Sequence, residues 1–177
     1  MTSNQTKQKH YGQRTLLGFD HGTRCIGVAV GQELTGSTQP IMTLKAQNGE
    51  PRWEEIDKLV KTWAADALIV GIPLDLDDTR QEMTERAEDF AKALLKRYQL
   101  PVFHSDERLT SMEAKNHLPP NTKATQRRDD WQRKSILDQV AAQLILQTWL
   151  SGSQDDQPIS LTPSTTTSPQ GNNANGS

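Results

Sequence analysis

The sequence predicts an α/β protein with a single mixed sheet and helices on both of its faces. Short apolar runs at residues 15–20, 25–31 and 36–44 are separated by polar turns, which is typical of an antiparallel meander. Two later apolar runs, 67–71 and 101–105, each follow a helical segment, so strand–helix crossovers should place them parallel in the same sheet. The 67–71 run has no polar alternation, as expected of a central strand covered on both faces.

The first two strands form a predicted β-hairpin. The apolar run 15–20 ends at Asp20, the turn contains Gly22, and apolar residues resume after Cys25. Asp and Gly favour turns, so Asp20 could serve only the turn. A carboxylate at the end of a strand is costly, however, unless it is hydrogen-bonded, paired or metal-bound. On this segment alone both interpretations of Asp20 stay open.

Helical periodicity is present in three long segments and predicts helices over about 52–65, 80–98 and 131–150. Pro51 stands at the first turn of the first helix, a position that proline favours. A short helix is expected from about Ser111, and Pro119 and Pro120 then break the chain. The expected order of elements is β-β-β-α-β-α-β-α-α, with five strands.

Both ends of the chain are expected to lie outside the folded domain, which we place at residues 14–150. Residues 1–13 are polar, and residues 151–177 consist almost wholly of Ser, Thr, Pro, Asn, Gln, Gly and Asp. Such segments bury too little apolar surface to offset the entropy of ordering, so we expect them to be disordered. The tail 151–177 should therefore be dispensable for folding.

Composition excludes several classes of protein. No apolar run reaches the ~20 residues of a membrane span, and the N-terminus lacks the apolar segment of a secretory signal. The single cysteine, Cys25, excludes an intramolecular disulfide and a Cys-rich zinc site. We expect a cytoplasmic protein that does not bind membranes, and the sequence does not predict its oligomeric state.

Positive charge is concentrated in one segment although the formal net charge is −2. Residues 115–134 hold six basic and two acidic side chains. A local patch of this kind can bind phosphate groups on an otherwise acidic protein, but a solvated loop would have the same composition. Trp131 lies beside this segment and is expected to pack at the start of the last helix. The basic residues are Lys115, Lys123, Arg127, Arg128, Arg133 and Lys134.

Two acidic residues directly follow the predicted strand 101–105. Asp106 and Glu107 should emerge at the same edge of the sheet as Asp20, because the carboxyl ends of parallel strands meet there. Side chains alternate along a strand, so only one of the two should face Asp20.

A third acidic residue, Asp138, lies in the last helix beside Ala141 and Ala142. These small residues would let the helix lie close to the sheet, although an acid near a helix N-terminus can also be only structural. Three converging carboxylates repel one another unless a cation lies between them, and oxygen ligands suit Mg²⁺ or Mn²⁺. Two such ions can activate a water and stabilise the leaving oxygen of a phosphodiester. The three acids together favour a metal-dependent nuclease.

Four motifs resemble those of the YqgF family, small bacterial proteins of ribonuclease H-like fold that are related to Holliday-junction resolvases. The resemblance covers residues 15–150 and implies a nuclease that matures the 5′ end of pre-16S ribosomal RNA, with resolution of DNA junctions as an older suggestion. It implies catalytic and metal-binding roles for Asp20, Glu107 and Asp138, and it favours Glu107 over Asp106. The motifs are Asp20-x-Gly22 with Ile26-Gly27-Val28-Ala29, Val70-Gly71-Ile72-Pro73, Asp106-Glu107-Arg108-Leu109-Thr110-Ser111 and Asp138-x-x-Ala141-Ala142.

The chain departs from the family pattern in one loop. The family usually carries Asp-Gly-Ser/Thr after the Gly-Ile-Pro motif, whereas this chain has Asp77-Asp78-Thr79, which leaves the backbone conformation of the loop open. The expected partner is nucleic acid, with structured RNA preferred and a DNA junction possible. The residues expected to contact it are Arg24, Arg108, Arg127, Arg128, Arg133 and Lys134.

Two other functions are compatible with parts of the sequence. The first hairpin also resembles the phosphate hairpin of actin-like ATPases and sugar kinases, but those proteins need two such domains around a nucleotide, and this chain supplies one. A non-catalytic nucleic-acid-binding module for ribosome assembly is the stronger rival. Three carboxylates near a phosphate backbone would weaken binding alone, which favours the nuclease.

Overall fold

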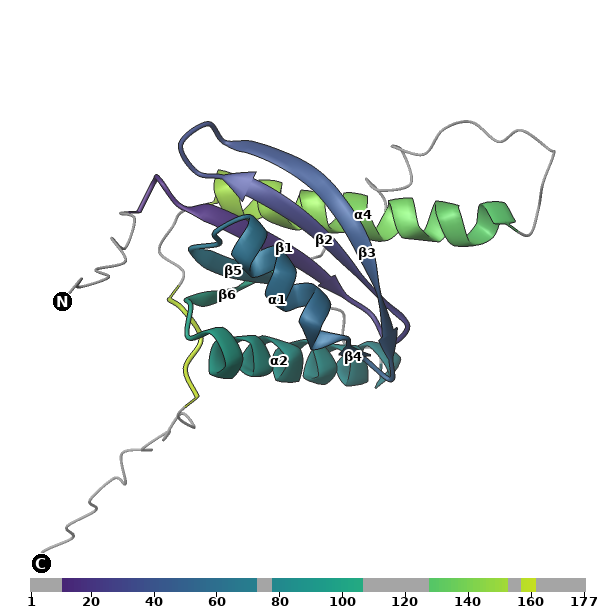
Figure 1. Cartoon of the computed structure of the whole chain (residues 1–177). Coiled ribbons are helices and arrows are strands. Elements are labelled where there is room, and N and C mark those ends of the chain that lie inside the picture. Colours follow the sequence, from purple (N-terminus) through teal and green to yellow (C-terminus); the bar gives the residue numbers. More distant parts are fainter. Residues whose placement is uncertain (1–10, 73–77, 107–127, 153–156, 162–177) are drawn as a thin grey trace, which may run out of the picture.

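The computed structural model describes residues 11–72, 78–106, 128–152 and 157–161. Within these residues the chain forms six strands and three helices (Figure 1). The predicted short helix near Ser111 lies outside the described residues. The strands are β1 (Thr15–His21), β2 (Cys25–Gln32), β3 (Ser37–Gln47), β4 (Glu50–Pro51), β5 (Ala67–Ile72) and β6 (Val102–Asp106), and the helices are α1 (Trp53–Thr62), α2 (Asp78–Tyr98) and α4 (Arg128–Ser151).

The strands form one mixed sheet in the order β4-β3-β2-β1-β5-β6. Neighbours from β4 to β1 are antiparallel, whereas β5 runs parallel to β1 and β6 parallel to β5. This confirms the predicted meander followed by parallel crossover strands, the topology expected of a ribonuclease H-like fold.

One strand more than predicted is present, because β3 is longer than its apolar run indicates. Asn48 and Gly49 both have positive φ, 54° and 82°, and turn the chain so that Glu50 and Pro51 pair back on β3 as β4. An Asn-Gly pair is a strong signal for such a two-residue hairpin turn.

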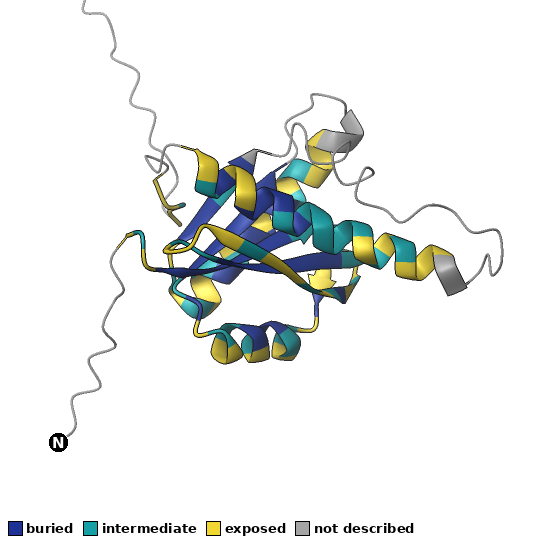
Figure 2. Cartoon of the chain, turned by 90° about the horizontal axis from the view of Figure 1, so that it is seen from above, coloured by how far each residue is buried: buried dark blue, intermediate teal, exposed yellow. Residues whose placement is uncertain are grey.

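The helices cover both faces of the sheet, as predicted. Helices α1 and α2 pack on one face and α4 crosses the other (Figures 1 and 2). Side-chain alternation divides β1 between the two cores: Leu17 and Phe19 contact the α1/α2 side, whereas Leu16 contacts the α4 side.

Glycines lie where α4 crosses β1 and β2. A Cβ atom added to Gly18 would lie 2.5 Å from Leu146 Cγ, and one added to Gly27 would lie 1.9 Å from the backbone oxygen of Asp138. The helix backbone therefore rests directly on the sheet at Gly27. On β3, the Thr43 hydroxyl donates a hydrogen bond of 2.8 Å to the Ser135 carbonyl, which sets the position of α4 along the sheet.

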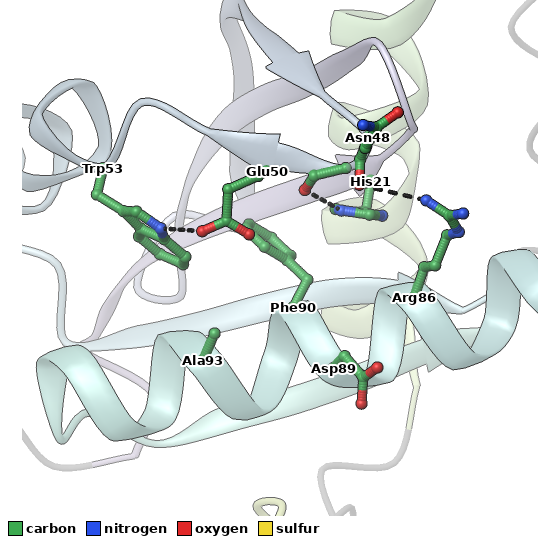
Figure 3. A pocket seen from close by; sticks show the side chains of 9 residues that line it. His21, Asn48, Glu50, Trp53, Arg86, Asp89, Phe90 and Ala93 are labelled. Carbon is green, nitrogen blue, oxygen red and sulfur yellow. Dashed lines mark hydrogen bonds between the residues drawn. The ribbon is translucent and has the colours of Figure 1, made fainter.

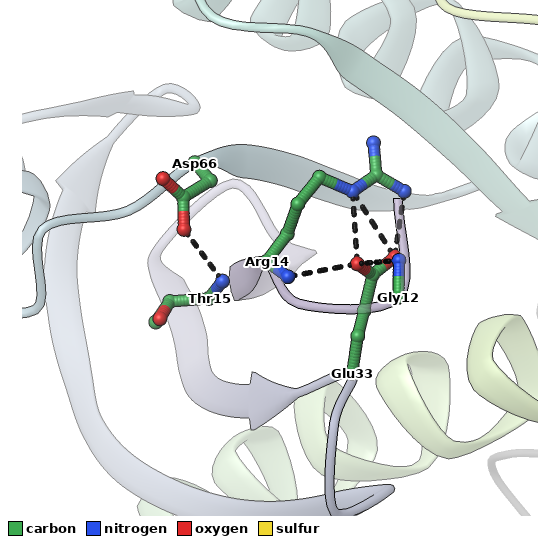
Figure 4. Close-up of polar contacts among 5 residues, drawn as sticks. All are labelled: Gly12, Arg14, Thr15, Glu33 and Asp66. Carbon is green, nitrogen blue, oxygen red and sulfur yellow. Dashed lines mark hydrogen bonds and ion pairs between the residues drawn. The ribbon is translucent and has the colours of Figure 1, made fainter. Parts of the chain in front are cut away.

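A buried ion pair fastens the start of β1 (Figure 4). Arg14 Nη2 donates to Glu33 Oε1 at 2.6 Å, and the backbone N–H groups of Gly12 and Arg14 donate to Glu33 Oε2. Burial disfavours the charge on Glu33, but the hydrogen bonds from Arg14 outweigh it and hold the pKa of Glu33 below its ordinary value. The fastened segment thus begins at Gly12, two residues before the expected start of the domain.

The C-terminal segment makes contacts with the domain that the expected boundary at residue 150 does not include. The backbone N–H of Ile159 donates to the Val102 carbonyl at 2.8 Å, and the Ile159 side chain packs against the core on the α1/α2 side. Residue Ile159 therefore covers part of β6, the last strand in the sheet order. The tail was expected to be disordered and dispensable for folding, and the contacts of Ile159 make its contribution to stability a point to test.

Replacing Gly27 with alanine should destabilise the protein, because a backbone carbonyl 1.9 Å from the new Cβ cannot move aside without shifting α4. We expect Gly27→Ala to lower the free energy of unfolding by roughly 1–3 kcal/mol in urea titrations. The matched control is Gly31→Ala on the same strand, where the nearest atom to the added Cβ is 3.4 Å away. Equal stability of the two variants would contradict the close approach of α4.

Removing the segment that contains Ile159 should lower the melting temperature. A chain ending at Gly152 loses the Ile159 contacts, so we expect its Tm to fall by roughly 2–4 °C, the shift that about 1 kcal/mol produces in a domain of this size. A chain ending at Leu161 keeps these contacts and should melt like the full chain. Identical Tm values for the three chains would show that Ile159 adds no stability and that the folded domain ends at residue 150.

Candidate active site

Asp20 lies near the end of β1 on the face that α4 covers. Leu16 and Gly18 contact α4, and alternation places Asp20 on the same face two residues further on. Asp20 is paired across the hairpin with Gly27, the residue on which the backbone of α4 rests. The sequence left open whether Asp20 serves only the turn, and the structure places it in the strand, facing the helix.

Asp138 meets Asp20 at this point. Its backbone lies on Gly27, and its Oδ2 atom is buried without a hydrogen-bond partner among the described residues. Burial and, next, the negative charge of Asp20 raise the pKa of Asp138 to about 6, while Lys134 acts in the opposite direction. The structure thus brings two of the three predicted carboxylates together, at an energetic cost to the charged form of Asp138.

The pair fits a divalent cation by its chemistry. A cation between Asp20 and Asp138 would offset their repulsion and supply a partner for the buried Oδ2 atom. Both donors are carboxylate oxygens, the ligand type that Mg²⁺ and Mn²⁺ prefer. The part of the chain that the structure describes contains no group of three or more His, Cys, Asp or Glu side chains that could hold a metal ion. The third predicted ligand, Glu107, lies outside the described residues.

The predicted nucleic-acid contacts are only partly described. Arg24 is exposed in the turn between β1 and β2, close to the end of β3, where its carbonyl accepts a hydrogen bond from Ala46. Lys134 is exposed and Arg133 is partly exposed, both on α4 about one turn before Asp138. Arg128 is the first residue of α4. Arg108 and Arg127 lie outside the described residues.

A histidine that the sequence analysis did not consider supports the strand end from the opposite face. His21 follows Asp20 and shares a hydrogen bond of 2.9 Å with the Gly49 carbonyl, while its ring lies 4.8 Å from that of Phe90 (Figure 3). Burial lowers the pKa of His21, which favours the neutral ring. The sequence signal that could have identified His21 is its position directly after Asp20, since side-chain alternation along a strand places it on the opposite face. It lines a pocket of about 210 Å³ with eight other residues: Asn48, Gly49, Glu50, Trp53, Arg86, Asp89, Phe90 and Ala93.

Asp138→Asn should stabilise the metal-free protein, and the gain should depend on pH. The raised pKa means that folding favours the protonated form of Asp138. The cost of a charged Asp138 to the free energy of unfolding is therefore absent below the ordinary pKa of 3.8, grows as the pH rises, and is complete above about 6. Unfolding titrations in EDTA at pH 4 and pH 7.5 should therefore show a larger gain at pH 7.5.

Mg²⁺ or Mn²⁺ should reverse the order of stability, because the ion stabilises the wild type more than the variant. Asp130→Asn removes the same charge from an exposed position of α4 and is the control. A pH-independent effect of Asp138→Asn, or no shift of wild-type Tm with either ion, would contradict the carboxylate pair.

Comparison with known proteins identifies the family. The family described as "RuvX: Holliday junction resolvase" matches residues 14–152. A relative from Azotobacter vinelandii, named "Putative pre-16S rRNA nuclease", is 51% identical over 140 residues, which cover 79% of this chain and 95% of the relative. A Pseudomonas aeruginosa relative with the same name is 47% identical over 142 residues, covering 80% and 95%.

Solved structures resemble the chain more distantly. The structure of T. thermophilus RuvC in complex with a Holliday junction substrate matches 83% of this chain and all of its own, with 12% identity and a TM-score of 0.47. No helix in the described residues is long and apolar enough to cross a membrane. The family match and the relatives confirm the resemblance found in the sequence: the chain belongs to the RuvX family, also called YqgF.

Proposed function

We propose that this protein is a metal-dependent nuclease that hydrolyses a phosphodiester bond near the 5′ end of pre-16S ribosomal RNA. The observation that carries the proposal is the pairing of Asp20 with Asp138, whose buried Oδ2 atom lacks a partner among the described residues. A binding module has no use for two carboxylates that repel each other and the phosphate backbone, whereas a metal centre requires them.

Glu107 is the third ligand in this proposal, and the register of β6 supports it. Phe103 packs against Trp149 of α4, and the Ser105 hydroxyl donates to the Ile145 carbonyl of α4 at 3.3 Å. His104 lies between them in the sequence and interacts electrostatically with Glu88 and Lys92 of α2, the helix on the opposite face. Odd positions of β6 therefore face α4, and Glu107 is the next odd position. Asp106 has the opposite parity.

The carboxylates would hold Mg²⁺ or Mn²⁺, which in such a site supplies activation of a water and stabilisation of the leaving oxygen. The chain itself orients these groups, since Gly27 fixes the separation of Asp138 from Asp20. Lys134, about one turn before Asp138, can hold a phosphate next to the carboxylates. Arg24, Arg108, Arg127, Arg128 and Arg133 complete the proposed phosphate contacts.

The choice of substrate rests on the relatives. Both are named as nucleases of pre-16S ribosomal RNA, and the matches cover 95% of their length at 47–51% identity. A cytoplasmic location follows from such a substrate. The family description favours a second candidate, cleavage of a DNA Holliday junction by the same site.

Cleavage assays test the nuclease and distinguish the substrates. Purified protein with Mg²⁺ or Mn²⁺ should cut a labelled pre-16S 5′ leader in preference to a four-way DNA junction, and excess EDTA should abolish cleavage. Asp20→Asn and Glu107→Gln should lower the rate at least about 100-fold, because each removes a charged metal ligand. Asp106→Asn is the matched control and should cost far less.

Undiminished cleavage in EDTA would refute the metal centre. A large loss with Asp106→Asn and a small one with Glu107→Gln would instead show that the register past Asp106 shifts by one residue. Preferential cleavage of the four-way DNA junction would show that the second candidate, a DNA Holliday junction, is the substrate.

A further inference from the structure

The first turns of α4 extend beyond the edge of the sheet (Figures 1 and 2). Trp131 lies in these turns and is 50% exposed, so the expectation that it packs at the helix start is wrong. A half-exposed indole offers a flat apolar ring that a ligand can cover, with a gain in free energy from the area removed from water. Among the described tryptophans it is the exposed one: Trp149 is buried, and Trp53 and Trp63 pack against the core.

A cation from the sheet lies over the Trp131 ring. The ammonium of Lys45 is 5.8 Å from the ring centroid. The packing of α4 on β3 explains how the two residues meet. Thr43 of β3 bonds Ser135 of α4. Lys45 lies two residues after Thr43 on the same face of β3, and Trp131 lies about one helical turn before Ser135, so the two side chains come together. The pair is thus held by the same register that places Asp138 on Gly27.

The surface around this pair suits a polyanion. Lys45 of β3 is paired with Cys25 of β2, which follows the exposed Arg24. Lys134 is also exposed and lies about one turn after Trp131 on α4. Asp130 is the exposed acid beside them. Lys45 lies two strands across and two residues along from Asp20, which strand geometry puts at roughly 12 Å. A nucleic-acid strand that is cut at the carboxylates would therefore reach this surface one or two nucleotides away from the cleaved bond.

We propose that Trp131 and Lys45 form a stacking site for an unpaired nucleotide of the RNA substrate, close to the cleaved bond. The base stacks on the indole, and its phosphate contacts the Lys45 ammonium. Aromatic rings bind unpaired bases in this way, and nearby cations add to the attraction. A base inside a duplex cannot reach the ring, so this site selects substrates that are single-stranded at this point. The inference rests on the proposed nuclease function.

Binding measurements in the Asp138→Asn protein, which should bind without cutting, test the contact. The probes are a labelled single-stranded RNA of about 12 nucleotides and a blunt duplex of the same sequence. Trp131→Ala should raise Kd for the single strand roughly 5- to 150-fold and for the duplex less than about twofold. Trp131→Phe keeps a ring and should recover most of the affinity. Leu34→Ala, which truncates another exposed apolar side chain in the turn between β2 and β3, is the control.

Two further measurements separate stacking from a structural role. RNA should quench the part of the fluorescence that Trp131→Phe removes, and Lys45→Ala should reduce the slope of log K against log salt by about 1. Unchanged single-strand affinity in Trp131→Ala, equal losses on both probes, or no quenching would overturn the stacking site alone. Failure of the parent protein to bind either probe would overturn the stacking site, whereas the proposed function is refuted only if the protein also fails to bind and cut the pre-16S 5′ leader.

Discussion

The contact between α4 and Gly27 is the constraint on which the site depends. A helix normally stands off a sheet by the thickness of its side chains, but here the Asp138 carbonyl occupies the space that any Cβ at residue 27 would need. Asp20 is the cross-strand partner of Gly27, so the same contact sets the distance between the two carboxylates. One missing side chain therefore positions a helix, a strand end and an acidic pair at once.

Two buried acids show how differently the fold treats structural and functional charge. Glu33 is paired with Arg14 and accepts two backbone N–H groups, so its charge is fully compensated and its pKa is lowered. Asp138 is pushed in the other direction, with a pKa of about 6 and an oxygen that lacks a partner in the described residues. Uncompensated charge of this kind is retained where a ligand supplies the missing partner, and in the proposed metal centre that partner is a cation.

Sequence periodicity was sufficient to predict the meander and the crossover strands, because alternation along a buried strand leaves one register. It missed β4, since the apolar run ends at Leu44 and the turn signal Asn48-Gly49 begins four residues later. Ile159 could not be predicted either, because a single apolar residue in a polar tail has no periodicity. Trp131 was misassigned for a related reason: composition does not say how far a helix projects beyond the sheet that it covers.

Helix α4 joins chemistry and substrate binding in one rigid element. Trp131, Lys134 and Asp138 lie on successive turns of α4. Thr43 of β3 bonds Ser135, which lies between them, and Gln139, which follows Asp138. A base held at Trp131 is therefore at a set distance from the carboxylates. Sliding α4 along the sheet would break the Thr43 contact and drive the helix backbone into strand residues that carry side chains. The position of cleavage relative to an unpaired nucleotide is, on this view, a property of helix packing and is set by the same glycine that forms the acidic pair.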